Sequence, residues 1–100
     1  MIKHIVFWRL KNREDARSRD ENAHAIKQKI EGLRGKIPGL LHIEAGIDFS
    51  QSDTSCDVVL YSEFESRAAL DGYQNHPAHL EIVAFIGERR SERRLGDYEV

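Results

Sequence analysis

Residues 2–10 constrain the fold most, because β-branched and aromatic residues recur there on both faces of a possible strand. One face would carry Ile2, His4, Val6, Trp8 and Leu10, and the other Lys3, Ile5, Phe7 and Arg9. A sheet covered on one side leaves its other face in water, and that face is then usually polar. Apolar residues on both faces therefore predict a strand with protein on each side.

A helix and two strands are predicted next along the chain. Residues 15–33 carry an apolar stripe at helical spacing, formed by Ala16, Ala23, Ile26, Ile30 and Leu33. Gly35, Pro38 and Gly39 end that helix. Residues 40–49 then alternate with period two, with one face formed by Leu41, Ile43, Ala45, Ile47 and Phe49. Residues 56–64 are also strand-like, and a polar loop over 50–55 predicts an antiparallel pair.

Two helices and a last strand complete the prediction. Ser66 is a good cap for a short helix from Arg67 to Gly72 or Tyr73. His76 and Pro77 are typical of the cap and first residue of a further helix, which runs to about Gly87. Residues 93–100 form the weakest predicted strand.

The order strand, helix, strand, strand, helix, strand is that of a ferredoxin-like α+β fold, with a four-stranded antiparallel sheet and helices on one face. One hundred residues with 40% hydrophobic content suit a single domain over 1–100. The open apolar face of the sheet predicts a homodimer that pairs face to face.

Composition excludes several classes of function. The formal charge of -2 is spread along the chain, so we expect no nucleic-acid partner. The cluster Arg89, Arg90, Arg93 and Arg94 is interrupted by Glu88 and Glu92, which predicts a solvated turn with local ion pairs. The lone Cys56 and the absence of a leader or membrane-spanning segment favour the cytoplasm.

The segment Tyr73-Gln74-Asn75-His76-Pro77-Ala78-His79 holds the candidate chemistry. His79 shares a helical face with Ile82, Val83 and Ile86, so it points toward the sheet. Six residues of unbroken helix would separate Tyr73 from His79 around the axis, and only the break before Pro77 lets them converge. A buried neutral imidazole can act as a base, and a phenol can donate a hydrogen bond to an oxyanion. The same pair is also compatible with a hydrogen-bonded core that has no catalytic role.

The other histidines are predicted to line the pocket or to have no role in its chemistry. His4 shares its strand face with Val6 and Trp8 and is a candidate for the wall of the same pocket. His76 and His79 lack a third ligand at suitable spacing, so no metal site is predicted. His24 and His42 lie on polar stripes and are predicted to be solvated. No phosphate-binding loop or nucleophile elbow is present, and residues 97–100 are read as the end of a strand.

Several blocks of the chain resemble the stress-responsive A/B barrel domain family. These blocks are Met1-Ile2-Lys3-His4-Ile5-Val6-Phe7, Lys36-Ile37-Pro38-Gly39, Glu63-Phe64-Glu65-Ser66, the segment from Tyr73 to His79, and Asp97-Tyr98-Glu99-Val100. The resemblance implies a dimeric α+β barrel built from two ferredoxin-like subunits. It also implies a stress response whose biochemical basis is mostly undefined.

Plant members of that family include olivetolic acid cyclase, which closes a ring by an aldol condensation without a cofactor. By resemblance, His79 matches its histidine base, Tyr73 its tyrosine partner and His4 a histidine of its cavity. Val58 stands where the cyclase has a further pocket histidine, which argues against the same polyketide substrate.

The resulting hypothesis is a cofactor-free protein that binds a small, partly apolar carbonyl compound. Its catalytic residues would be His79 and Tyr73, and its pocket would be lined by His4, Val6, Trp8, Val58 and Val83. A non-catalytic dimer that binds ligands or contributes to stress tolerance is one alternative. A cofactor-free monooxygenase, with Phe7 and Trp8 near an aromatic substrate, is another.

Overall fold

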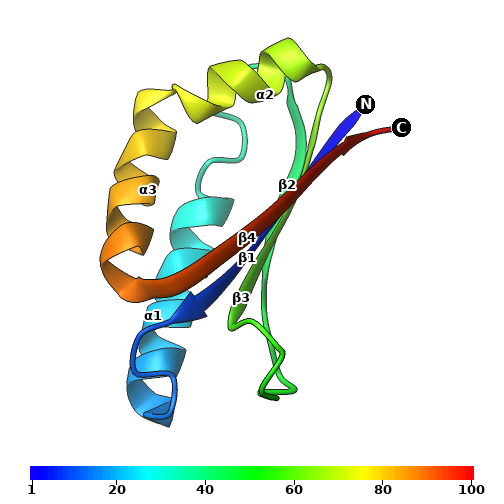
Figure 1. The fold of residues 1–100 in the computed structure, drawn as a ribbon. Coiled ribbons are helices and arrows are strands. Elements are labelled where there is room, and N and C mark those ends of the chain that lie inside the picture. Colours follow the sequence, from blue (N-terminus) through cyan, green and yellow to red (C-terminus); the bar gives the residue numbers. More distant parts are fainter.

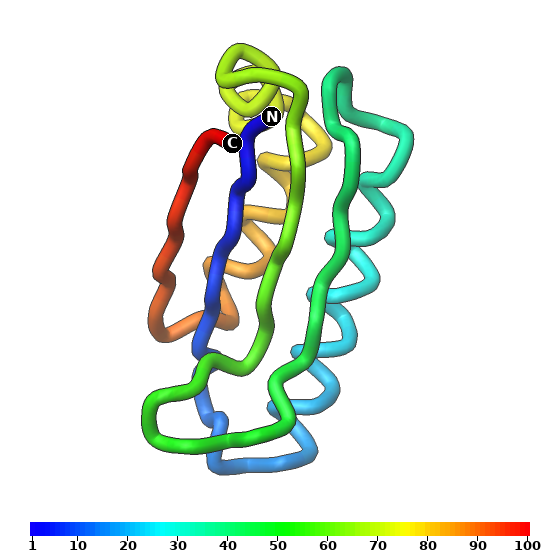
Figure 2. The backbone as a smooth tube through the Cα atoms, turned by 90° about the vertical axis from the view of Figure 1, so that its right-hand side faces the viewer, coloured from blue at the N-terminus to red at the C-terminus, as the bar shows by residue number.

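The computed structural model describes residues 1–100. Its elements, in chain order, are β1 (Ile2–Leu10), α1 (Ala16–Glu31), β2 (Leu40–Ile47), β3 (Val58–Phe64), α2 (Arg67–Gln74), α3 (Pro77–Arg89) and β4 (Arg90–Glu99). The strands form one 4-stranded antiparallel sheet in the order β2-β3-β1-β4 (Figure 2). The ferredoxin-like fold predicted from the sequence is therefore confirmed.

The helices all lie on one face of the sheet, as Figure 1 shows. On that face the side chains of Ile2, Val6, Trp8 and Leu10 are buried. The opposite face of β1 is left partly open, and Phe7 on it is 42% exposed. The predicted two apolar faces of the first strand are therefore present, and the single chain covers only one of them.

Capping side chains mark the first turns of the helices. The Asp15 carboxylate accepts the backbone N–H groups of Arg17 and Ser18 at 3.1 and 3.2 Å. The Ser66 hydroxyl accepts the N–H of Ala69 at 3.1 Å, which starts α2. These side chains satisfy N–H groups that the first turn of a helix leaves without a partner.

Two strands differ from their predicted form. In β2, the register against β3 shifts between Leu40 and His42, so Leu41 turns outward and is 54% exposed. Phe49 lies beyond the end of β2 and is 95% exposed, so neither residue shares a buried face with Ile43 and Ala45 as the alternation predicts. β4 begins at Arg90 rather than at residue 93, because the chain leaves α3 directly into pairing with Leu10. Residues 90–94 are charged or polar, so a hydrophobicity pattern does not predict a strand there.

The helices contact the sheet unequally. α1 packs on β2 and also approaches β3 and β1, whereas the backbone of α3 comes closer to α1 and α2 than to the strands. Every residue of β4 is exposed. The sheet is therefore well covered over β2 and β3 and poorly covered over β4. No helix has both the length and the apolar character needed to cross a membrane.

Candidate active site in the cavity under α3

A cavity of about 230 Å³ lies between α3 and the sheet. Twelve residues line it, of which 8 are hydrophobic. They are His4, Val6, Trp8, Ile30, Leu60, Tyr73, His79, Ile82, Val83, Ile86, Arg90 and Arg93. An apolar cavity with a few converging polar groups is typical of a small-molecule site.

The structure brings Tyr73 and His79 together on the wall of this cavity. Their ring centroids are 4.1 Å apart, with 42° between the ring planes. α2 ends at Gln74 and α3 begins at Pro77, so the two rings stand on different helices that meet at a bend. The backbone break at the proline thus has the geometric effect that the sequence predicts.

The phenol of Tyr73 is placed to donate a hydrogen bond to a ligand. The residue is only 2% exposed, and burial raises the pKa of its hydroxyl to about 12. No protein group accepts a hydrogen bond from this hydroxyl, and its oxygen is not completely buried. The hydroxyl therefore stays protonated at neutral pH and faces the cavity with its donor unused.

The imidazole of His79 is placed to accept a proton. Its Nδ1 lies 3.3 Å from the carbonyl oxygen of Gln74. A carbonyl only accepts hydrogen bonds, so Nδ1 carries the proton of the neutral ring and Nε2 keeps its lone pair. Burial lowers the pKa of His79, and the nearby His4 and Arg93 lower it further, while the hydrogen bond to the Gln74 carbonyl acts in the opposite sense. His79 is thus a neutral base at physiological pH.

His4 closes the cavity on the sheet side. It is 2% exposed, and its ring stands edge-on to the ring of Tyr73 with centroids 6.0 Å apart. Its Nδ1 forms a hydrogen bond with the carboxylate of Asp97, which lies opposite it in the β1–β4 pairing. The carboxylate fixes the orientation of the imidazole. Sequence reasoning missed Asp97, because only the pairing of the first and last strands reveals it.

The remaining predicted pocket residues divide in two. Val6, Trp8 and Val83 line the cavity. Val58 does not line it: this residue is 0% exposed and is enclosed between its strand partners Trp8 and Ile47.

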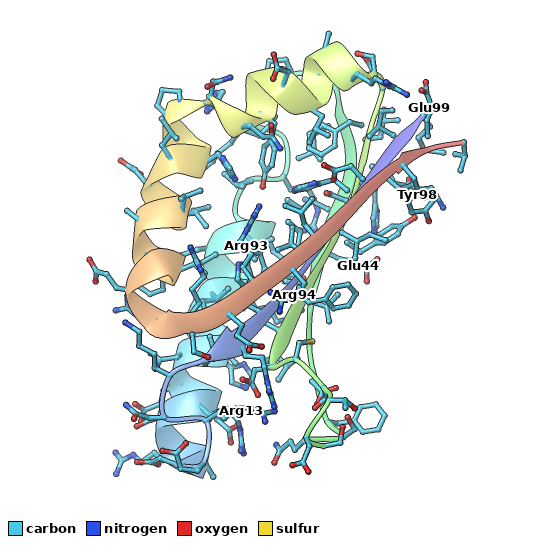
Figure 3. The ribbon with its side chains drawn as sticks, in the orientation of Figure 1. Arg13, Glu44, Arg93, Arg94, Tyr98 and Glu99 are labelled. Carbon is cyan, nitrogen blue, oxygen red and sulfur yellow. The ribbon has the colours of Figure 1, made fainter.

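Arg90 and Arg93 were expected in a solvated turn, and they also line the cavity. The expected local pairing is present for Arg89, whose guanidinium lies 3.6 Å from the carboxylate of Glu88. Arg93 pairs with Trp8 across the sheet, so its side chain is on the helix-covered face. Figure 3 shows Arg93 on the helix side of β4 and Tyr98 on the opposite side. Side chains alternate between the two faces of a strand, so a strand predicted from residue 90 would have placed Arg93 and Arg94 on opposite faces.

Solved structures of the same fold come from several kinds of protein. A dimeric ferredoxin-like protein of unknown function from Bacteroides fragilis is 28% identical, with a TM-score of 0.88 over 99% of this chain and 95% of that one. A hydroxynitrile lyase from Passiflora edulis is 18% identical, with a TM-score of 0.80 over 99% and 92% of the two chains. An antibiotic biosynthesis monooxygenase is 19% identical, with a TM-score of 0.75 over 100% and 98%. At these lower identities the last two share the fold alone.

No curated protein sequence matches the chain. The family model for Dabb, the stress responsive A/B barrel domain, matches residues 2–100. The chain therefore belongs to the stress-responsive A/B barrel domain family.

Proposed function

We propose that this protein binds a small, partly apolar carbonyl compound in the cavity under α3 and removes a proton from the carbon next to the carbonyl. The observation that carries the proposal is the pairing of Tyr73 and His79 on the cavity wall, with ring centroids 4.1 Å apart. One of these side chains has an unused donor and the other an unused lone pair. This is the pair of groups that proton abstraction beside a carbonyl requires.

The proposed step needs no cofactor. Nε2 of His79 takes the proton, and the electrons of the broken C–H bond move to the carbonyl oxygen, which becomes an enolate. Tyr73 donates a hydrogen bond to that oxygen as its negative charge develops. The enolate then either takes the proton back from His79, or attacks a second carbonyl of the same molecule and closes a ring, in which case the new alkoxide takes that proton. His4, held by Asp97, orients the ligand from the sheet side.

The cavity limits the size of the ligand. Its volume of about 230 Å³ exceeds that of the roughly 150 Å³ engineered cavity that binds benzene, and is below the roughly 300 Å³ at which pockets for drug-sized ligands begin. Its mainly hydrophobic lining favours a ligand with an apolar body. A compound with one aromatic ring and a short ketone chain fits both limits.

Deuterium exchange tests the proposed chemistry. We expect the protein to speed the exchange of the hydrogens next to the carbonyls of 1-phenylpentane-1,4-dione in D₂O, followed by NMR. His79→Gln should lower the protein-dependent rate by about a hundredfold or more. Tyr73→Phe should lower it by about a hundredfold. The control His24→Gln changes an exposed histidine on α1 and should keep the wild-type rate.

The alternative of a non-catalytic binding module makes a different prediction in the same samples. It predicts that the dione shifts the NMR signals of His79 while exchange stays at the rate of protein-free buffer. That result would remove the catalytic part of the proposal and leave a ligand-binding protein that contributes to stress tolerance. A His79 signal that stays unchanged with every carbonyl compound would contradict binding as well.

We further propose that the protein acts as a homodimer joined through the open face of the sheet, which gives the two-subunit barrel of its family. The large hydrophobic side chains Phe7 and Tyr98 on that face are 42% and 50% exposed. The dimeric state of the 28% identical protein from Bacteroides fragilis supports this assembly. Cys56 is unpaired, as is usual in the reducing cytoplasm, which is where we propose the dimer acts.

Sedimentation velocity tests the dimer. Phe7→Glu places a charge in the centre of the proposed interface, and we expect it to convert the protein to monomers. Leu80→Glu is the matched control, because Leu80 is 52% exposed and belongs to α3, which lies on the face of the sheet opposite to the proposed interface. A Phe7→Glu protein that sediments as the wild type does would contradict this interface.

A further inference from the structure

Two arginines stand out among the ten of the chain because their side chains have no partner in the protein. Five arginines form ion pairs: Arg13, Arg17, Arg19, Arg67 and Arg89. Three more donate to backbone carbonyls: Arg9, Arg34 and Arg94. Only Arg90 and Arg93 make neither kind of contact, and both line the cavity under α3.

Arg93 is close enough to the candidate catalytic pair to act on it electrically. Its positive charge lowers the pKa of both Tyr73 and His79, although burial is the larger influence on each. The next residue, Arg94, pairs with Phe7 and so belongs to the opposite face of the sheet. Figure 3 shows both arginines on β4. The strand thus directs one guanidinium to the cavity and the neighbouring one away from it.

The cavity has no negative charge of its own to balance these arginines. None of its 12 lining residues is an aspartate or a glutamate. The nearest carboxylate on the helix side of β4 is that of Asp97, and it is already hydrogen-bonded to His4. The lining therefore presents two guanidinium groups beside an apolar space, with no protein anion among its residues.

We infer that the natural ligand is a keto acid, whose carboxylate binds Arg93 and Arg90 while its ketone faces Tyr73 and His79. This inference rests on the proposed function, because it names the substrate class of the same cavity. The planar guanidinium fork matches a carboxylate with two parallel hydrogen bonds. The mainly apolar lining favours a carboxylate carried on a hydrophobic body over a free inorganic anion.

A pair of matched probes tests the inference. 3-Benzoylpropionate and 1-phenylpentane-1,4-dione have nearly the same shape and both carry an aryl ketone, but only the first has a carboxylate. We expect the wild-type protein to bind the acid about tenfold more tightly than the dione, which is the range for a charge-assisted hydrogen bond. Binding is followed by the NMR shift of His79, so that the site of binding is observed directly.

Two variants assign the preference to the cavity arginines. Arg93→Gln should remove most of the preference for the acid, so that the acid and the dione bind this variant with similar affinities. Arg94→Gln makes the same change of charge one residue away, on the other face of β4, and should keep the preference. Raising the salt concentration should weaken binding of the acid and not of the dione, because salt screens exposed charges.

The outcomes separate this inference from the proposed function. If both probes shift His79 with equal affinity, the keto-acid assignment is wrong and the carbonyl site stands. If Arg93→Gln and Arg94→Gln reduce the preference equally, the effect comes from net charge and the assignment is also wrong. If neither probe shifts His79, both the assignment and the proposed function are contradicted.

Discussion

The two halves of the helix-covered sheet face differ in how completely they are filled. Under α1 the packing is solid, with Ile26, Ile43 and Val58 at most 1% exposed. Under α3 there is the cavity, and only Ile82 and Ile86 of the 13 residues of that helix are buried. The titratable side chains of the candidate site lie in the hollow half. The difference between the two halves indicates that the cavity exists where no side chain ties the covering helix to the edge strand.

Anchoring side chains account for the difference between the halves. β2 is an edge strand, and side chains from α1 and the turn after it bind its backbone. Glu31 accepts the N–H of Ala45 at 3.2 Å, and Arg34 donates to the carbonyl of Ile43 at 2.8 Å. α3 makes no comparable bond to β4, the other edge strand. Its one long cationic side chain near that end, Arg89, instead bonds to Phe85 within the helix.

The largest expected effect comes from truncating a side chain in the solid half. Ile26→Ala should lower the free energy of unfolding by about 2–5 kcal/mol, because it leaves a hole among fully buried neighbours. Val83→Ala removes a side chain that borders the cavity and is 48% exposed, so it should cost less than about 0.5 kcal/mol. Urea denaturation of both variants measures the two values. Equal losses would show that the cavity half is as tightly packed as the other.

A second comparison concerns two hydroxyl groups, one in each kind of environment. The buried hydroxyl of Ser62 donates to the carbonyl of His4 at 2.8 Å, so Ser62→Ala should cost about 1 kcal/mol. The hydroxyl of Tyr73 has no protein partner, so Tyr73→Phe should change stability by less than about 0.5 kcal/mol. Thermal and urea unfolding test this pair. A clear destabilisation by Tyr73→Phe would mean that the phenol is a structural donor rather than one kept for a ligand.

The smallest expected effect is on the titration of His79. Its pKa should lie below the ordinary value of about 6.5 when followed by NMR. Burial is the largest cause, and the groups that also act on this pKa are Gln74 on α2, His76 at the start of α3, His4 on β1 and Arg93 on β4. Arg93→Gln should raise this pKa, because it removes a positive charge, and Arg94→Gln should change it less. A pKa above 6.5 would contradict the burial of the ring.

The same shift gives a sign for the pH dependence of stability. A histidine whose pKa is lower in the folded state binds protons more readily when unfolded. The contribution of His79 to folding is therefore complete above about pH 6.5 and is lost as the pH falls from there through its folded pKa. His79→Gln should remove this part of the pH dependence.

Sequence reasoning predicted the fold and the proximity of Tyr73 and His79 for identifiable reasons. The capping residues Ser66 and His76 and the proline at residue 77 are local signals, and they locate the bend that joins Tyr73 to His79. Asp97 and Arg93 could not be placed in the same way, because their neighbours come from a pairing of the first and last strands. Leu41 was misplaced because a single shift of register, which no periodicity reveals, turns it to the other side.

A crystal structure of the protein with 1-phenylpentane-1,4-dione tests the central claim most directly. We expect the ligand in the cavity under α3, with one carbonyl oxygen within hydrogen-bond distance of the Tyr73 hydroxyl and the adjacent carbon facing Nε2 of His79. If side chains fill that space and the two rings face apart, the proposed chemistry is contradicted.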